Sequence, residues 1–304
     1  MEGLNLSRTY NNKNTKPLII DTYPSFIEFW DRVKDLPIDT QIEAWHNEYM
    51  SQWPELLEKQ ITEYKNDGLD WKVIAKERIF PLIPEYVDKF KRARDNLLEV
   101  ASYVYEYASK VFDIDFEVVF VIYVGIGLGA GWATTYDSKP ACLFGLENIA
   151  ELNWSDKETL AALAAHELGH LIHIKWRESL GLSRGSGSLW NLYEEGLAMR
   201  FEHIIMGRET WHEQKGQNEW LEWCNKNKSG LASEFLKRVD NDETVKDFFG
   251  TWYNIQGYTQ CGYFIGHELI KEMEQDYSIK EISVLPLHEI ERLLRKMLSK
   301  LAQC

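Results

Sequence analysis

The segment from Leu160 to Ile172 constrains the fold more than any other, because it places two histidines and a glutamate within a nearly continuous apolar sequence. Apolar residues on almost every side are typical of a helix that is buried in a protein interior. On such a helix His166 and His170, four residues apart, lie on one face, and Glu167 stands beside them. Left unpaired in an apolar interior, these side chains would cost several kcal/mol. A metal ion that binds both imidazoles removes that cost, so the sequence predicts a buried metal site.

The spacing His-Glu-x-x-His is that of a catalytic zinc site, in which the two histidines bind the ion and the glutamate reaches the metal-bound water. A capping box at the start of the helix supports this interpretation, with Ser155 as the N-cap residue and Glu158 reaching back to it. His173 lies on the same face, but three side chains of one straight helix do not fit a single tetrahedral ion. We therefore expect His173 to support the ligands from behind or to pack in the core.

Catalytic zinc usually has three protein ligands and an open position for water, so a third ligand is expected further along the chain. The metzincin pattern does not supply it, because His173 and Trp176 stand where its glycine and its last histidine would be. The predicted helix over residues 190–206 contains two neighbouring glutamates, Glu194 and Glu195, and both are candidates.

We predict Glu195 as the third ligand and keep Glu194 as the alternative. Glu195 is followed by Gly196 and Ala198, whose small size would let this helix approach the motif helix closely. The glycine- and serine-rich loop over residues 181–188 is long enough to turn the chain around between two antiparallel helices.

The combination of His166-Glu167-x-x-His170 with Glu195-Gly196-Leu197-Ala198 resembles the gluzincins, zinc peptidases whose third ligand is a glutamate on a following helix. More narrowly, it is similar to a group of bacterial predicted zinc-dependent proteases, and the resemblance covers residues 115–273. It implies a zincin-like catalytic core with one Zn2+ per chain, bound by His166, His170 and Glu195. It also implies hydrolysis of peptide bonds by a metal-activated water, with Glu167 as the general base.

Several gluzincin-like families place a tyrosine so that its hydroxyl donates a hydrogen bond to the oxyanion of the reaction. The matching stretch here is Gly262-Tyr263-Phe264-Ile265-Gly266, and the resemblance gives this role to Tyr263. Tyr258 is the alternative, and a tyrosine that only packs against the core is an equally open interpretation. His267 and Glu268 repeat the start of the zinc motif, but Lys271 stands where the second histidine would follow, so we expect no zinc site there.

The rest of the sequence predicts an α+β fold that is mostly helical, with a small sheet packed on the motif helix. Hydrophobic spacing predicts a helical N-terminal region over residues 1–112 and a helical C-terminal region over 181–304, which carries the third ligand. Residues 113–180 should contain the motif helix and three strands, at 116–124, 132–136 and 141–144, the first buried on both faces. By the resemblance, an edge strand between Gly131 and Gly145 pairs with the extended substrate backbone.

Composition and charge exclude several classes of partner. The 304-residue chain has a formal net charge of −14 and no basic patch, which argues against nucleic acid and against an anionic membrane surface. No apolar run reaches the length of a membrane span, and the first residues contain no apolar targeting segment, so we expect a cytoplasmic protein. Cys142, Cys224, Cys261 and Cys304 form no C-x-x-C pair, which argues for reduced thiols and against a second metal site.

The sequence thus favours a zinc-dependent peptidase that acts on a peptide or protein substrate. Two alternatives remain open. One is a regulatory protease similar to the family that cleaves phage repressors, whose later Glu-x-x-Ala-x-x-Phe pattern is matched by Glu195, Ala198 and Phe201. The other is a non-catalytic scaffold in which the metal is structural or absent, although a structural site has no need of Glu167 as a base.

Overall fold

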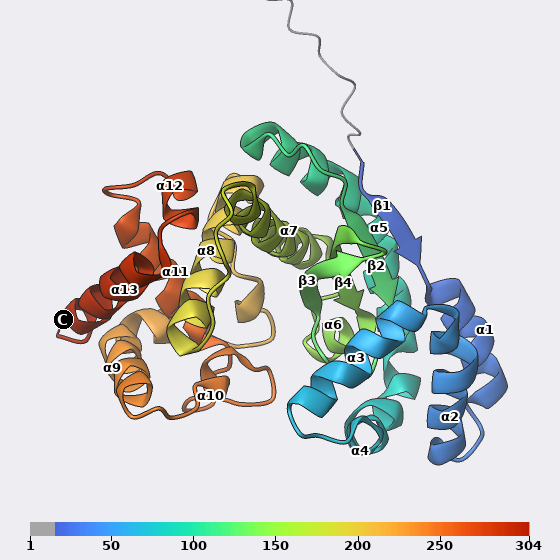
Figure 1. Ribbon diagram of the computed structural model, residues 1–304. Coiled ribbons are helices and arrows are strands. Elements are labelled where there is room, and N and C mark those ends of the chain that lie inside the picture. The colour runs from blue at the N-terminus through green and yellow to red at the C-terminus, as the bar shows by residue number, and fades with distance from the viewer. Residues whose placement is uncertain (1–15, 304) are drawn as a thin grey trace, which may run out of the picture.

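Four short strands form one mixed sheet, and helices cover this sheet and build the rest of the molecule (Figure 1). The computed structural model describes residues 16–303 and confirms the predicted α+β, mostly helical fold. The strands are β1 (Leu18–Asp21), β2 (Val119–Tyr123), β3 (Gly131–Tyr136) and β4 (Lys139–Gly145).

Helices precede and follow the motif helix, which is α7 (Lys157–Ser179). The helices before it are α1 (Tyr23–Val33), α2 (Ile38–Ala44), α3 (Pro54–Asn66), α4 (Trp71–Ile74), α5 (Ile83–Phe112) and α6 (Leu146–Glu151). The helices after it are α8 (Ser188–Met206), α9 (Trp220–Asp240), α10 (Lys246–Phe249), α11 (Cys261–Met273), α12 (Ile279–Ser283) and α13 (Leu287–Leu301). None of the helices over residues 16–303 combines the length and the apolar sequence needed to cross a membrane.

The sheet has the strand order β1-β2-β4-β3, in which β1, β2 and β4 are parallel and β3 is antiparallel to β4. The three predicted strands are confirmed as β2, β3 and β4, and β2 is buried along its whole length. A tight turn at Asp137 and Ser138, both with positive φ, joins β3 to β4. β3 is therefore an edge strand, and among the described residues one of its sides pairs with no other strand.

Strand β1 is an addition to the N-terminal region, which was predicted as helical and otherwise consists of helices over its described residues. It pairs in parallel with β2, so that Leu18 lies opposite Val119 and Asp21 lies opposite Ile122. Asp21 also accepts a hydrogen bond from the guanidinium of Arg94 on α5, with an Nε–Oδ2 distance of 2.8 Å. Four residues are too few to produce a recognisable periodicity, and strand formation here depends on a partner far along the chain.

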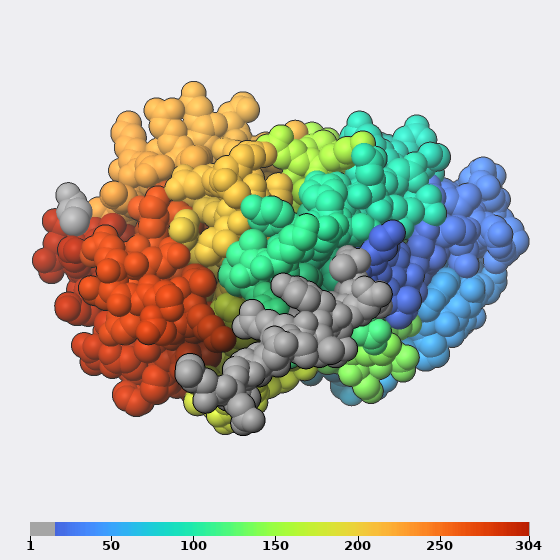
Figure 2. All heavy atoms as spheres, turned by 90° about the horizontal axis from the view of Figure 1, so that it is seen from above, coloured from blue at the N-terminus to red at the C-terminus, as the bar shows by residue number. Residues whose placement is uncertain are grey.

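Helix α7 lies in the middle of the molecule, between the sheet and the C-terminal helices (Figure 1). It packs against α5 and β3 on one side and against α8 on the other. Gly169 allows the close approach of α7 to α8, because a Cβ at this position would lie 2.6 Å from the Cβ of Phe201. Seen from above, the N-terminal part (blue to teal) and the C-terminal part (orange to red) occupy opposite ends of the molecule (Figure 2).

Gly196 has a different partner from the predicted one. A Cβ on Gly196 would lie 2.6 Å from the Cα of Gly266, so this glycine brings α8 close to α11 and not to α7. Of the two small residues that follow Glu195, it is Ala198 that faces α7, and its backbone oxygen lies near Gly169. Small residues in a sequence indicate a close helix contact, but the neighbour they contact depends on the rotation of the helix in the folded chain.

The start of α7 also differs from the predicted capping box. Asp156 is the N-cap residue, and its carboxylate accepts hydrogen bonds from the backbone N–H and the hydroxyl of Thr159, at 3.0 and 2.9 Å. Ser155 is fully buried, and its hydroxyl has no hydrogen-bond partner within the described part of the chain. Unlike a serine hydroxyl, the negative carboxylate of Asp156 also favours the positive end of the helix dipole.

Candidate metal centre

Three side chains from two helices meet in the middle of the molecule: His166 and His170 of α7 and Glu195 of α8. Nε2 of His166 lies 3.1 Å from Nε2 of His170 and 3.1 Å from Oε2 of Glu195. Nε2 of His170 lies 3.3 Å from the same oxygen. Two imidazole nitrogens and a carboxylate oxygen that converge in this way can hold a metal ion.

The structure distinguishes between the two neighbouring glutamates. Oε2 of Glu194 accepts hydrogen bonds from Arg184 at 2.7 Å and from Nε1 of Trp190 at 3.1 Å, so its carboxylate is held away from the two histidines. Glu195 points toward them instead. Of the two candidates for the third ligand, the structure brings Glu195 into the group with His166 and His170.

The charge of Glu195 suits a metal ligand. Burial by itself would raise the pKa of this carboxyl group, but the neighbouring His170 and His166 hold the pKa well below its usual value. The side chain is therefore an ionised carboxylate at neutral pH, which is the form that binds metal ions.

Glu167 stands outside the group of three and faces a cleft beside it. Burial raises the pKa of Glu167 above its usual value, although the neighbouring His170 and His166 lower it in part. A carboxylate whose pKa is raised toward neutrality is suited to accept a proton and to return it. Glu167 therefore lies at the cleft wall, beside the group formed by His166, His170 and Glu195.

The two candidate tyrosines lie in different surroundings. The ring of Tyr263 on α11 lies 5.6 Å from the ring of His166, centre to centre, and Tyr263 lines the same cleft as Glu167. Burial raises the pKa of Tyr263 well above its usual value, so the hydroxyl stays protonated and can donate a hydrogen bond. Tyr258 instead stacks on Trp223, with ring centres 4.5 Å apart, and it is not part of the cleft wall.

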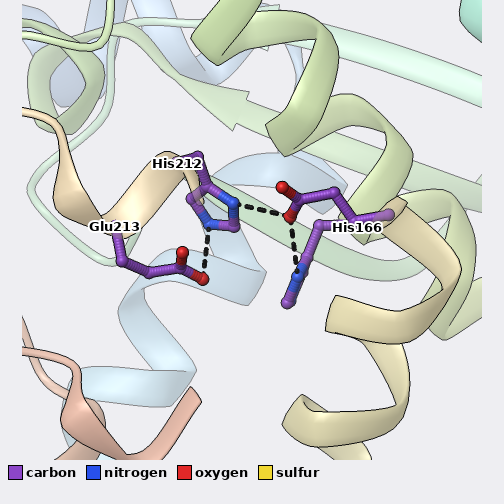
Figure 3. A group of neighbouring side chains, drawn as sticks. His166, His212 and Glu213 are labelled. Atoms are coloured by element: carbon purple, nitrogen blue, oxygen red, sulfur yellow. Dashed lines mark hydrogen bonds and ion pairs between the residues drawn. The ribbon is translucent and has the colours of Figure 1, made fainter. Parts of the chain in front are cut away.

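Behind His166 lies a second group of buried side chains: Glu202 of α8, and His212 and Glu213 of the short helix η5 (His212–Gln214) (Figure 3). Oε2 of Glu202 lies 3.6 Å from Nδ1 of His166 and accepts a hydrogen bond from Nδ1 of His212 at 2.8 Å. Nε2 of His212 lies 3.4 Å from Oε1 of Glu213. Nδ1 of His166 makes no hydrogen bond within the described part of the chain, and the Glu202 carboxylate lies just beyond hydrogen-bond distance of it. A small movement of either side chain would let this carboxylate orient the imidazole.

The sequence contained a signal for only one member of this second group. Glu202 comes seven residues after Glu195, about two helical turns, so both side chains lie on the same side of α8. That spacing could have identified Glu202 as a partner of the site. His212 and Glu213 belong to a separate short element, and their position depends on how the chain folds back after α8.

The remaining histidines of interest lie outside the centre. His173 is buried and its ring stacks on Trp190, with centres 5.6 Å apart, which agrees with a role in the core. His267 lies near His203, and these two histidines and Glu209 form another group of side chains close enough together to hold a metal ion. Nη1 of Arg200 lies 3.2 Å from Nε2 of His267 and 3.4 Å from Nδ1 of His203, so a guanidinium cation already contacts one nitrogen of each ring.

A cleft of 610 Å3 opens beside the candidate centre. His166, Glu167 and Tyr263 line it together with residues 127–131 and residues in the range 244–253. Its volume lies within the range of about 300–1,000 Å3 that is typical of sites for small ligands. Of the three candidate ligands, only His166 lines this cleft, together with Glu167 and Tyr263; His170 and Glu195 are not part of its wall.

Comparisons of the chain with protein-family models, with curated proteins and with solved structures find no match. The functional assignment therefore depends on the motif and on the geometry of the site.

Proposed function

We propose that this protein is a zinc-dependent peptidase with a zincin-like catalytic core, in which His166, His170 and Glu195 bind one Zn2+. The observation that carries the proposal is the convergence of these three side chains beside a cleft whose wall contains His166, Glu167 and Tyr263. A structural metal site has no need of a neighbouring base or of a hydrogen-bond donor that faces a cavity.

The donor set and its spacing fit zinc. Two ligand atoms that each lie about 2.0–2.1 Å from a tetrahedral zinc ion are about 3.3 Å apart. The three ligand atoms here are 3.1, 3.1 and 3.3 Å apart, so a tetrahedral ion fits with small adjustments of the side chains. Two imidazoles and one carboxylate leave a fourth position for water.

Zinc bound at this site would supply a water whose pKa is lowered to about 7. Glu167 accepts a proton from the attacking water and passes it to the departing amine, first as general base and then as general acid. The protonated hydroxyl of Tyr263 donates a hydrogen bond to the oxyanion that forms on the substrate carbonyl.

The position of the edge strand supports a peptide as the substrate. β3 begins at Gly131, which lies against the side chain of Glu167, and one side of this strand is free of strand pairing among residues 16–303. An extended peptide that pairs with β3 therefore passes directly in front of the candidate base.

The first experiment is measurement of the zinc content of the purified protein by plasma mass spectrometry. We expect about one zinc per chain in the wild type, in agreement with one three-ligand site. Glu195→Gln should lose most of the zinc, and Glu194→Gln, the matched control at the neighbouring position, should retain it. A wild type that binds no zinc after supplementation would contradict the proposal and favour the scaffold interpretation.

The second experiment separates catalysis from metal binding. Glu167→Gln should retain the zinc of the wild type, because Glu167 is not one of the three converging side chains. Its turnover of a peptide library should fall by about 10²- to 10⁴-fold, the usual contribution of a positioned general base. Wild-type turnover in this variant would exclude Glu167 as the base.

A further inference from the structure

The cleft lies between two walls that come from distant parts of the chain. One wall includes Tyr64 and Asp67 of the N-terminal part together with the glycine-rich loop of residues 127–131. The opposite wall includes most of residues 244–253, which we call the strap; it contains α10. In Figure 1 the strap extends from the C-terminal helices toward α3 and α4.

Trp252 of the strap reaches across to the N-terminal part. Its indole Nε1 donates hydrogen bonds to both carboxylate oxygens of Glu151, at 3.1 and 3.2 Å. The guanidinium of Arg78 lies 4.6 Å from the centre of its ring. The ring also lies on the glycine-rich loop, because a Cβ added to Gly127 would be only 3.1 Å from it. Hydrogen bonds, a cation–π contact and close packing thus hold Trp252 against the opposite wall.

A second contact joins the two walls of the cleft. Nζ of Lys246 lies 3.1 Å from Oδ1 of Asp67, and both residues line the cleft. The pair is exposed and contributes little to stability. It nevertheless shows that the strap meets the N-terminal wall at two separate points, Trp252 and Lys246.

The strap also contacts the catalytic side of the cleft. The ring of Phe249 lies 6.0 Å from the ring of Tyr263, centre to centre. Phe249 also packs against Gly262, where a Cβ would collide with its ring. The strap therefore contacts both the opposite wall of the cleft and Tyr263, one of the residues that we assign to catalysis.

The course of a bound peptide brings it against the strap. A peptide paired with β3 would pass Glu167 at Gly131, and from there the cleft continues along the glycine-rich loop, on which Trp252 lies. An extended chain advances about 3.3 Å per residue, so a cavity of this size has space for only a few residues beyond the reacting bond. A folded protein or a long chain that continues in both directions meets the strap.

We propose that the strap restricts this enzyme to short, unstructured peptides and to chain ends, with Trp252 and Lys246 as the residues that set the length limit. This inference rests on the proposed peptidase function. It names the substrate class of the same site.

The test uses unstructured peptides that share one central cleavage site and differ only in length on either side of it. The wild type should cleave short members and lose kcat/KM steeply as the chain extends on one side. In Trp252→Ala the ratio of kcat/KM for long over short peptides should rise by about 10-fold or more. Trp71→Ala is the matched control, because Trp71 is also half-buried beside a cation, in this case Lys72, but does not line the cleft.

A second variant tests the same inference in case Trp252→Ala does not fold. Lys246→Glu places a negative charge opposite Asp67 at an exposed position, so the fold is preserved and the ratio should change in the same direction. Equal length profiles in the wild type and both variants, or fast internal cleavage of a long unfolded chain by the wild type, would overturn the inference.

Binding to Glu167→Gln separates this inference from the proposed function. Fluorescence anisotropy measures binding of the same labelled peptides to this variant, with and without Trp252→Ala. If binding depends on peptide length, and Trp252→Ala reduces that dependence, the result supports the proposed role of the strap. If the wild type at the same time cleaves none of the peptides, the proposed peptidase function is overturned. Cleavage that does not depend on peptide length would support the peptidase function and overturn the role of the strap. The absence of both binding and cleavage would overturn both proposals.

Discussion

Gly131, the first residue of edge strand β3, lies so close to Glu167 that a Cβ on Gly131 would be 2.8 Å from both Cγ and Cδ of that glutamate. Only a residue without a side chain allows the backbone of the strand and the carboxylate to approach each other in this way. The contact connects the edge on which we expect a substrate to lie with the side chain that we assign as the base.

Replacing Gly131 with alanine should therefore displace the carboxylate of Glu167. We expect kcat to fall by about 100-fold, because a misplacement of about 1 Å can have that effect. Zinc content should stay at the wild-type level. Gly230→Ala on α9 is the control, since a Cβ there meets no atom within 4 Å. Full turnover in Gly131→Ala would show that this contact does not position the base.

Tyr263→Phe should remove the hydrogen bond to the oxyanion and leave the ring in place. Loss of one such donor lowers kcat by about 10²- to 10³-fold. KM should change little, because the interaction forms in the transition state. Tyr258→Phe, whose ring stacks on Trp223 away from the cleft, should keep wild-type kinetics. If the two variants lose the same activity, or if only Tyr258→Phe loses it, the assignment to Tyr263 is wrong.

Glu202→Gln should weaken zinc binding although Glu202 is not expected to touch the ion. Its carboxylate lies 3.6 Å from Nδ1 of His166, and changes at such a position usually reduce metal affinity by about 10- to 100-fold. Competition with a chelator of known affinity measures the effect. Glu213→Gln, one step further from His166, should have a smaller effect. Unchanged affinity in Glu202→Gln would contradict a role in orienting His166.

The buried carboxyl group of Glu147 should make the free energy of unfolding depend on pH, whether or not a metal is bound. Burial raises its pKa from 4.5 to about 7, although its carboxylate accepts hydrogen bonds from the backbone of Gly125 and Gly127. Between these two values the folded chain keeps the proton and the unfolded chain releases it, so stability falls as the pH rises. The free energy of unfolding should lose about 3 kcal/mol across this window.

Urea unfolding of the wild type and of Glu147→Gln over this pH range isolates the contribution of Glu147. Glutamine does not titrate, so the stability of the wild type relative to the variant should decrease from about pH 4.5 to about pH 7. A difference that stays constant over the range would show that Glu147 has an ordinary pKa in the folded state.

The sequence by itself determined the elements whose evidence is local. The apolar composition of α7 predicted a buried helix, and the spacing of His166, Glu167 and His170 put them on neighbouring positions of it. The β-branched and aromatic run that became β2 was recognisable for the same reason. Helical and strand periodicities are properties of consecutive residues, so they can be read before the chain is folded.

Only the tertiary structure decided which residues meet across long distances in the chain. The sequence argument for Glu195 over Glu194 relied on the small residues after it, but it is the rotation of α8 that decides which glutamate faces His166. The same holds for Gly196, which turned out to face α11, and for β1, which depends on its pairing with β2. His212 near the candidate metal centre and Trp252 across the cleft have no local signal, because their contacts arise from packing between segments that the sequence does not place relative to one another.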